Sequence, residues 1–434
     1  MVPVDTIPSL LLKGMTLVLP SGILQGDILL ESGKITAIGP NLPRHAATII
    51  ETPHLTVFPG FIDSHVHFRE PGATHKETIE TGSRAAVAGG ITSFFEMPNT
   101  SPATTTQAAL DDKLARAAQT SYCNYAFFIG ATPENLTHLD TIGPAPAVKL
   151  FAGSSTGDLL VNKTADWETL FRHTTRIIST HSEDDALIHT ASIDNATAAD
   201  HPSIRSTEAA ITCTKRLVTL ALTHNRRLHI CHLTTKDECD FLASLNSPLI
   251  TTEVTPQHLH FTDAAYAKHQ NFLKINPPIR ASYHRDALWQ ALKAGVIPFI
   301  ASDHAPHTRA EKDQPYLTAP SGMPIVEFTV PLLLTYYAQK KVSLQQIATW
   351  LSHAPAQCYR VKNKGKLAVG YDADITIVDT ERTQLVRSIH SKSGWSALEN
   401  TTLTGWPVMT LVNGQIAYRD GDFYRGAARP VVFA

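Results

Sequence analysis

The sequence predicts an α/β protein: a TIM-like (β/α)8 barrel joined to a small β-sandwich domain that is built from both termini. Three observations favour this fold. The 434 residues are enough for a large hydrophobic core. Strand-like and helix-like segments alternate through the middle of the chain, as in a parallel barrel of about 250 residues with insertions. Both ends of the chain carry short β-like runs separated by turns that contain glycine.

Short strand-like runs characterise both ends of the chain. Near the N-terminus they cover residues 16–19, 27–31 and 34–38, with glycine-containing turns at 20–22 and 31–33. Near the C-terminus similar runs cover residues 373–379, 409–414 and 415–418. Because the two ends share this character and the middle does not, we predict one small β-sandwich domain made of residues 1–58 and 366–434.

The middle of the chain, residues 59–365, is the predicted barrel. Helix-like segments cover residues 76–88, 106–120, 184–191, 207–224, 283–294 and 343–351. Strand-like runs between them include residues 91–96, 123–129 and 249–253. A doubly wound open sheet is the alternative, but no Gly-x-Gly-x-x-Gly follows a strand-like run in the sequence, which disfavours a dinucleotide-binding fold.

Composition and charge exclude several classes of protein. Hydrophobic residues make up 43% and charged residues 18% of the chain, and the formal net charge is -2, which is typical of a soluble globular protein. No basic excess predicts a nucleic-acid partner, and no apolar run reaches the roughly 18 residues of a membrane span. The N-terminal segment lacks the pattern of a secretion signal. Five scattered cysteines predict a reducing compartment, so we expect a cytoplasmic protein.

Two histidines two residues apart are the strongest local signal of chemistry. His65 and His67 come at the end of an apolar, β-prone run that begins near residue 57. Side chains alternate faces along a strand, so residues i and i+2 point to the same side, and two imidazoles can hold one metal ion. Taken alone, the pair is equally well explained as two partly buried histidines.

Four further polar residues end strand-like runs later in the chain: Lys149, His181, His232 and Asp303. The C-terminal ends of the strands of a parallel barrel meet at one mouth, so these side chains and the histidine pair are predicted to converge there. Each residue alone is better explained as structural, but the joint pattern is not. Cys231 could add a thiolate ligand, although a buried small apolar side chain explains it better.

The types of these side chains favour a metal centre. Neutral imidazole and carboxylate bind zinc-like cations, and two ions about 3.5–4 Å apart activate one bridging water and polarise a carbonyl. The ammonium of Lys149 repels a metal, so Lys149 either pairs with an acid at the barrel mouth or carries CO2 as an anionic carbamate. Asp303 is suited to bind a metal with one oxygen and to shuttle a proton with the other.

Three further polar residues belong to the predicted site. Arg69, just after the histidine pair, suits a carboxylate, although a salt bridge with Glu70 or Glu77 explains it equally well. Asn99 and His307 lie at expected strand ends, where turn formation or loop capping is the alternative role.

Seven motifs together make the chain resemble the dihydroorotases of the amidohydrolase superfamily over nearly its full length. They lie at residues 60–72 (GFIDSHVHFREPG), 89–92 (GGIT), 96–100 (EMPNT), 148–151 (VKLF), 231–232 (CH), 276–280 (NPPIR) and 301–308 (ASDHAPHT). The resemblance implies a zinc-dependent cyclic amidohydrolase that interconverts N-carbamoyl-L-aspartate and L-dihydroorotate in de novo pyrimidine synthesis. A homodimer is the expected assembly.

The resemblance also implies a set of metal ligands. His65, His67, Lys149 and Asp303 would bind one zinc ion. Lys149, in carboxylated form, would bridge to a second zinc ion held by His181 and His232. Asp303 would be the catalytic acid and base, acting with a hydroxide that bridges the two metals.

Substrate-binding residues follow from the same resemblance. Arg69, Asn99 and His307 would hold the substrate carboxylate, and Asn276 would lie near the ring. Ser155 and Thr156 fall where related enzymes carry a loop over the substrate.

Two other interpretations stay open. Allantoinases and hydantoinases resemble this chain in fold, metals and reaction. Their substrates do not present a free carboxylate in the same place, so Arg69 favours dihydroorotase. A catalytically inactive relative that serves as a partner subunit is the second alternative, and the complete set of ligand types argues against it.

Overall fold

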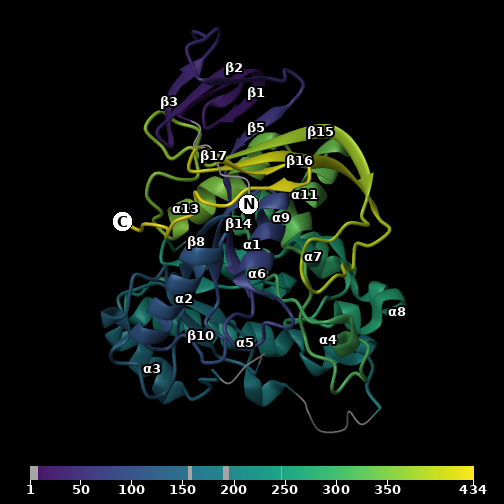
Figure 1. Cartoon of the computed structure of the whole chain (residues 1–434). Helices are drawn as coiled ribbons and strands as arrows, with labels where there is room; N and C mark the ends of the chain where they lie inside the picture. Colours follow the sequence, from purple (N-terminus) through teal and green to yellow (C-terminus); the bar gives the residue numbers. More distant parts are fainter. Residues whose placement is uncertain (1–7, 155–158, 189–194, 246) are drawn as a thin grey trace.

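Parallel strands and the helices between them form the predicted barrel (Figure 1). The computed structural model describes residues 8–154, 159–188, 195–245 and 247–434. In these ranges the barrel strands, in order, are β6 (Phe61–Val66), β7 (Ile91–Glu96), β8 (Asn124–Phe127), β9 (Ile129–Gly130), β10 (Val148–Phe151), β11 (Ile178–His181), β12 (Leu228–Ile230), β13 (Ile250–Val254) and β14 (Phe299–Ile300). Their pairings are parallel, and nearly all of their residues are buried, as in a sheet covered by helices outside and packed side chains inside.

The regular strand pairing of the barrel is interrupted at two places. β9 follows β8 after one residue and pairs with β10, so the two short pieces act together as the third of eight strand positions. At the other seam, the backbone N–H of His67 donates to the carbonyl of His304 at 2.8 Å, next to a parallel bridge between Val66 and His304. The first and last strands are therefore joined beside the histidine pair.

The helices begin at side chains that satisfy the free N–H groups of their first turns. Thr78 and Thr81 form a capping box at the start of α1, and Thr106 and Ser206 cap α2 and α5. The α-helices are α1 (Ile79–Ala88), α2 (Gln107–Thr120), α3 (Thr164–His173), α4 (His201–Ile204), α5 (Thr207–Thr223), α6 (Lys236–Leu245), α7 (Pro256–His260), α8 (Tyr266–His269), α9 (Ser282–Lys293), α10 (Arg309–Lys312), α11 (Thr329–Ala338), α12 (Leu344–Ala348) and α13 (Ala354–Cys358).

Two predicted helices differ in the structure. Residues 184–188 contain only a 3-10 turn, Asp185–Leu187, and residues 189–191 lie outside the described residues. The carboxylate of Asp184 accepts from the N–H of Ala186, which is the kind of local side-chain bond that competes with a helix. The segment predicted at 343–351 is interrupted, because α12 passes through a π-helical turn, Thr349–His353, into α13.

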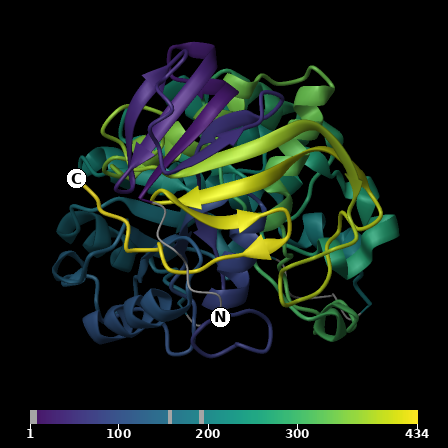
Figure 2. The ribbon, with the colours of Figure 1, turned by 45° about the horizontal axis from the view of Figure 1, so that its top comes forward.

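Strands from both ends of the chain form one nine-stranded sheet within the described residues, which confirms the predicted β-sandwich domain. Its order is β18-β17-β16-β15-β5-β1-β2-β3, with β4 beside β1. The strands are β1 (Ser9–Leu19), β2 (Gly22–Glu31), β3 (Lys34–Gly39), β4 (Thr48–Glu51), β5 (Thr56–Pro59), β15 (Ile375–Leu385), β16 (Thr402–Val412), β17 (Gln415–Arg419) and β18 (Asp422–Phe423). Figure 2 shows the N-terminal strands in purple beside the C-terminal strands in yellow.

The sheet has a hydrophobic core of its own, to which both ends contribute. Leu12, Ile28, Ile377 and Leu411 are among its fully buried side chains. The division of the chain into residues 1–58 with 366–434 and residues 59–365 stays a prediction. The sheet takes in β5 up to Pro59 and resumes with β15.

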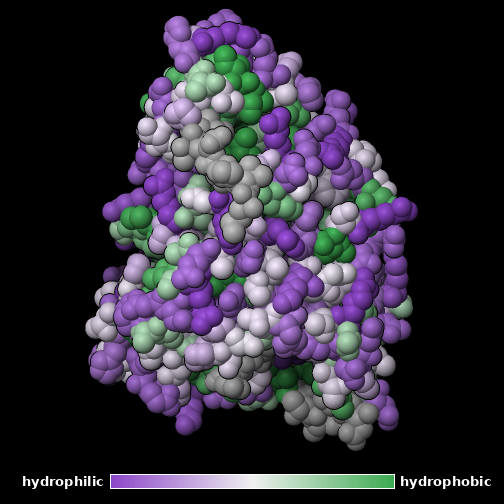
Figure 3. Space-filling model, in the orientation of Figure 1, coloured by the Kyte–Doolittle hydropathy of each residue, from purple (hydrophilic) through white to green (hydrophobic). Residues whose placement is uncertain are grey.

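The surface in Figure 3 is mainly hydrophilic, and its most prominent hydrophobic group lies at the top of the view, over the N-terminal strands. Ile23 of β2 is half exposed. Among the residues that the structure describes, no helix combines the length and the apolar character needed to cross a membrane.

Candidate active site

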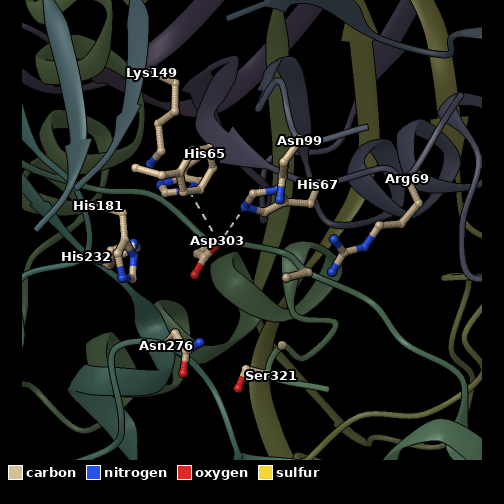
Figure 4. Close-up of a pocket in the computed structure, with 13 residues that line it drawn as sticks. His65, His67, Arg69, Asn99, Lys149, His181, His232, Asn276, Asp303 and Ser321 are labelled. Atoms are coloured by element: carbon tan, nitrogen blue, oxygen red, sulfur yellow. Dashed lines mark hydrogen bonds and ion pairs between the residues drawn. The ribbon is translucent and has the colours of Figure 1, made fainter. Parts of the chain in front are cut away.

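One pocket at the C-terminal ends of the barrel strands brings together the six residues predicted to bind metal (Figure 4). They come from five strands or the segments that follow them: His65 and His67 at the end of β6, Lys149 in β10, His181 at the end of β11, His232 after β12 and Asp303 after β14. Arg69, Asn99, Asn276, Ser321 and Gly322 also line this pocket. The convergence follows from the parallel barrel, because every strand runs toward the same mouth.

His65, His67 and Asp303 form the tightest group. Oδ1 of Asp303 lies 3.1 Å from Nε2 of His67 and 3.4 Å from Nε2 of His65. One ligand atom from each residue lies within 4.8 Å of the others, a spacing that can hold a metal ion. Burial raises the pKa of the Asp303 carboxyl, but the nearby His65 and His67 outweigh it, and the net pKa is lowered.

Hydrogen bonds at Nδ1 orient the two histidines of β6. Nδ1 of His65 lies 2.5 Å from the carboxylate of Glu253, and Nδ1 of His67 lies 2.7 Å from the amide oxygen of Asn99. Both acceptors require a proton on Nδ1, so Nε2 is the nitrogen that each ring directs toward Asp303. Glu253 also accepts from His229, at 3.1 Å, so this buried carboxylate is fixed from two sides.

The metal-free charge states of the two rings differ. Burial lowers the pKa of His67 to about 4, so its imidazole is neutral. Burial and Lys149 also lower the pKa of His65, but the charges of Glu253 and Asp303 raise it more, to about 10. A cation at Nε2 of His65 would compete with this proton for the same negative surroundings.

His181 and His232 form the second group of ligands. Nδ1 of His181 lies 3.1 Å from Nε2 of His232, and Nε2 of His181 lies 2.8 Å from Glu183. Arg205 binds the same carboxylate of Glu183 at 2.9 Å through Nε. Burial lowers the pKa of both histidines, so both rings are neutral. Nδ1 of His232 is buried and has no hydrogen-bond partner, which is unusual for a buried polar atom.

Lys149 has no acidic partner in the part of the chain that the structure describes, so the alternative of a salt bridge at the barrel mouth is wrong. Its side chain is buried, and Nζ lies 3.0 Å from Sγ of Cys231 and 5.2 Å from the centre of the Phe151 ring. A buried ammonium without a counter-charge is costly. Conversion to an anionic carbamate between two metal ions would remove this cost.

The donor set therefore fits a metal centre. Four histidines and one carboxylate surround the pocket, two of the rings direct Nε2 toward Asp303, and one buried imidazole nitrogen lacks a partner. Neutral imidazole and carboxylate are the ligands that zinc prefers when cysteine is absent.

Backbone strain is concentrated in the same place. Arg69, His232 and Asp303 have φ angles of 65°, 36° and 48°, in the left-handed region that non-glycine residues rarely adopt. Each such residue costs of order 1 kcal/mol and persists only where the surroundings impose it. All three strained residues line the pocket, so the fold maintains these side chains in position at the expense of backbone energy.

Arg69 is buried beside the metal-ligand group and forms no ion pair with Glu70, Glu77 or another described residue. Nε donates to the carbonyl of Pro306 at 3.1 Å, and Nη2 lies 3.1 Å from Nε2 of His307. Glu70 and Glu77 instead accept from backbone N–H groups, of Ile79 and Lys392. Burial lowers the pKa of Arg69 to about 10, despite the opposing effect of Asp303 and other carboxylates.

Of the other predicted substrate-binding residues, two line the pocket, one does not, and two lie outside the described residues. Asn99 and Asn276 line the pocket; Oδ1 of Asn276 lies 3.0 Å from Nε2 of His201. His307 is fully buried behind Arg69 and is not among the residues that line the pocket. Ser155 and Thr156 lie outside the described residues.

Sequence reasoning missed several residues that support the site. Glu253, His229, Glu183 and Arg205 orient the candidate ligands through the bonds described above. Glu253 had a usable signal, because it ends a strand-like run in the same way as Lys149 and Asp303 do. The others had none, since a partner of a ligand is defined only by the folded structure.

Comparison with known proteins shows the family of this chain. The amidohydrolase family model matches residues 56–417. Dihydroorotases of Methanosarcina acetivorans and Bacillus caldolyticus are 32% and 34% identical to this chain; the alignments cover 97% and 94% of this chain and 96% and 98% of theirs. Among solved structures, the L-hydantoinase (dihydropyrimidinase) from Arthrobacter aurescens matches with a TM-score of 0.92 at 25% identity, over 98% of this chain and 99% of that chain. A D-hydantoinase from Thermus sp. matches with a TM-score of 0.88 at 26% identity, over 97% and 98%. The chain therefore belongs to the amidohydrolase family and, within it, to the dihydroorotases.

Proposed function

We propose that this protein catalyses the reversible cyclisation of N-carbamoyl-L-aspartate to L-dihydroorotate, a step of de novo pyrimidine synthesis. The observation that carries the proposal is a buried Arg69 guanidinium without a carboxylate partner among the described residues, in the same pocket as the histidines and Asp303. Such a cation is stable where a ligand supplies the missing negative charge. Dihydroorotate carries a free carboxylate beside its cyclic amide. The carboxylate suits Arg69, and the amide suits the group of histidines with Asp303.

We infer that the centre holds two zinc ions. His65, His67 and Asp303 would bind one ion, His181 and His232 the other, and carboxylated Lys149 both. The neutral imidazoles of His67, His181 and His232, the unpaired nitrogen of His232 and the missing acidic partner of Lys149 support this assignment. When bound, zinc supplies Lewis-acid polarisation of the amide carbonyl and lowers the pKa of water.

Asp303 is the proposed acid and base. Its lowered pKa keeps the carboxylate ionised at neutral pH, so it can accept a proton. In the hydrolytic direction it takes the proton of the attacking water and delivers it to the ring nitrogen as the C–N bond breaks. In the cyclising direction the carbamoyl nitrogen loses a proton to Asp303, and the proton leaves with the departing water.

Arg69 is the proposed anchor for the substrate carboxylate. Only its Nε is committed to the protein backbone, so the remaining N–H groups are available for a carboxylate. Asn99 and Asn276 add neutral polar groups to the lining of the pocket, and the amide oxygen of Asn99 binds His67.

The decisive experiment is an assay of the purified protein, with its bound metals counted, on dihydroorotate, hydantoin and allantoin. Turnover of dihydroorotate that a chelator abolishes and zinc restores is the expected result. Turnover of hydantoin or allantoin instead would support the proposed metal site but show that the substrate is a different cyclic amide. The hydantoinase structures of similar fold suggest this alternative. Bound metal without turnover of any of the three would identify a catalytically inactive relative.

We further propose that the protein acts in the cytoplasm as a homodimer. All five cysteines are buried and unbridged, which suits a reducing compartment. Sedimentation equilibrium of the purified protein tests the dimer.

A further inference from the structure

We propose that Lys76 is a positioning residue that fixes His307 as the tautomer with its proton on Nε2, and so places an N–H donor beside Arg69 for the substrate carboxylate. The proposal deepens the proposed function and rests on it. Lys76 lies in the segment between β6 and α1 and is not one of the predicted site residues. It would act on the substrate only through His307.

The two ring nitrogens of His307 have partners of different kinds. Nδ1 lies 3.0 Å from Nζ of Lys76. Nε2 lies 3.1 Å from the carbonyl oxygen of Ser321 and 3.1 Å from Nη2 of Arg69. The backbone is fixed as well, because Nε1 of Trp395 donates to the carbonyl of His307 at 2.6 Å. The ring is fully buried in the free protein.

These partners are compatible with one neutral tautomer. The ammonium of Lys76 has three N–H groups and no lone pair, so Nδ1 of His307 must accept. Nε2 then carries the proton and donates to the carbonyl of Ser321. The opposite tautomer would lose the bonds to Lys76 and to the carbonyl of Ser321 and gain only one, from Nη2 of Arg69 to Nε2, so it leaves the buried ring with one hydrogen bond fewer.

The donor on Nε2 lies beside a second donor. Because both Nε2–H of His307 and Nη2–H of Arg69 donate, their 3.1 Å contact is no hydrogen bond between them. Two adjacent donors from different side chains suit the oxygens of one oxyanion. In the free protein the Nε2–H of His307 donates to the carbonyl of Ser321. Because Ser321 lines the pocket, a substrate carboxylate oxygen could replace that carbonyl as the acceptor.

The tautomer matters because the ring is neutral. The charged groups that face it are Arg69 and Lys76, with Lys312 of α10 nearby, and the carboxylate of Glu311 lies 3.0 Å from Nζ of Lys76. Burial and the three cations lower the pKa of His307 well below its usual value. A neutral imidazole has a single N–H, so the side on which it lies decides whether His307 can donate to a carboxylate.

Lys76 is itself held in a defined place. Glu311 is fixed by a capping box at the start of α10, in which Thr308 donates to its carboxylate through both its N–H and its hydroxyl at 2.9 Å. The ammonium of Lys76 is therefore shared between a fixed carboxylate and Nδ1 of His307. Because Glu311 holds Lys76 in place, Lys76 can determine the tautomer of His307 although the two residues lie on different loops.

The test compares Lys76→Met, which removes the donor, with Lys76→Gln, which keeps an uncharged donor, in the zinc-loaded enzyme. Lys392→Met is the matched control, because Nζ of Lys392 donates to the carbonyl of Thr74 in the same loop and does not touch His307. Steady-state kinetics with L-dihydroorotate give kcat and KM. Histidine-selective 15N NMR reports the tautomer of His307, with its signals assigned from the spectrum of a His307→Gln variant.

We expect Lys76→Met to raise KM at least about tenfold with kcat within about twofold, from the loss of one donor to a charged group. Lys76→Gln should recover most of the loss, and Lys392→Met should stay within about twofold of wild type. NMR should show Nε2–H alone in the wild type and both tautomers in Lys76→Met.

Three results would overturn the proposal. The first is an unchanged KM in Lys76→Met. The second is an equal rise in KM in Lys392→Met, which would mean that the charge and not the hydrogen bond matters. The third is a wild-type ring protonated on Nδ1. Absence of dihydroorotate turnover in the wild type would refute the proposed function instead, and the NMR measurement would still decide the tautomer.

Discussion

Arg69→Met tests the substrate assignment most directly. The substitution keeps an unbranched side chain of similar length in the pocket wall and removes the guanidinium. If Arg69 anchors the substrate carboxylate, KM for dihydroorotate should rise strongly while metal content stays unchanged, because Arg69 contacts none of the candidate ligands. Binding that is lost equally in the ground state and the transition state appears in KM and leaves kcat almost unaffected.

The size of the effect follows from the bonds that remain available. Nε of Arg69 is used by Pro306, so a carboxylate can receive about two charge-assisted bonds from the Nη groups, each worth about 1.5–3 kcal/mol. Removing a buried cation also relieves a desolvation cost, so we take the lower end, about 3 kcal/mol in total. This corresponds to an increase in KM of about 100-fold.

The assay is steady-state hydrolysis of dihydroorotate with zinc counted in the same samples. Arg116→Met is the control, since Arg116 is 42% exposed and pairs with Asp112 and Glu70 on the outside of the barrel. The control should match the wild type. A KM for Arg69→Met within about threefold of the wild type would refute the reasoning and place the carboxylate elsewhere in the pocket.

Other perturbations test the remaining parts of the site. Asp303→Asn should lower kcat by about 1,000-fold with little change in the thermal midpoint of unfolding; near-normal turnover would exclude Asp303 as the acid and base. Glu253→Gln should weaken zinc binding about 10–100-fold in a chelator competition, because the orientation of His65 is lost; an unchanged affinity would show that Glu253 only fills space. Glu311→Gln should lower the free energy of unfolding by about 1 kcal/mol at neutral pH, allowing for partial exposure of Glu311. Burial raises the pKa of Glu311, but the bonds from Thr308 and Lys76 lower it more, from 4.5 to about 2. The wild-type advantage should therefore be complete above about pH 4.5 and disappear as the pH falls through about 2. Urea unfolding across this range measures it, and a difference that persists in acid would contradict the linkage.

The sequence predicted the architecture because both parts of the fold leave local signals. Alternating strand-like and helix-like segments indicate a parallel barrel, and most predicted elements lie within a few residues of the observed ones, as with β7 and α2. The segment at 184–191 failed for a local reason: Asp184 binds the backbone at Ala186 and the chain forms only a short turn.

The sequence also identified which side chains meet, since polar residues at the ends of buried strands must converge at the barrel mouth. It could not choose between the two roles open to Arg69. Only the folded chain shows that Glu70 and Glu77 are occupied by backbone N–H groups and leave Arg69 without a counter-charge.

By itself, then, the sequence determined the barrel, the β-sandwich domain built from both termini and the six candidate metal ligands at the mouth of the barrel. Periodicity and residue type are properties of neighbouring residues, so they can be read along the chain. What only the tertiary structure decided is how each of these side chains is oriented. Glu253 lies 188 residues from His65, and Lys76 lies 231 residues from His307. Hydrogen bonds over such separations are set by how the strands and loops pack, and no local pattern encodes them.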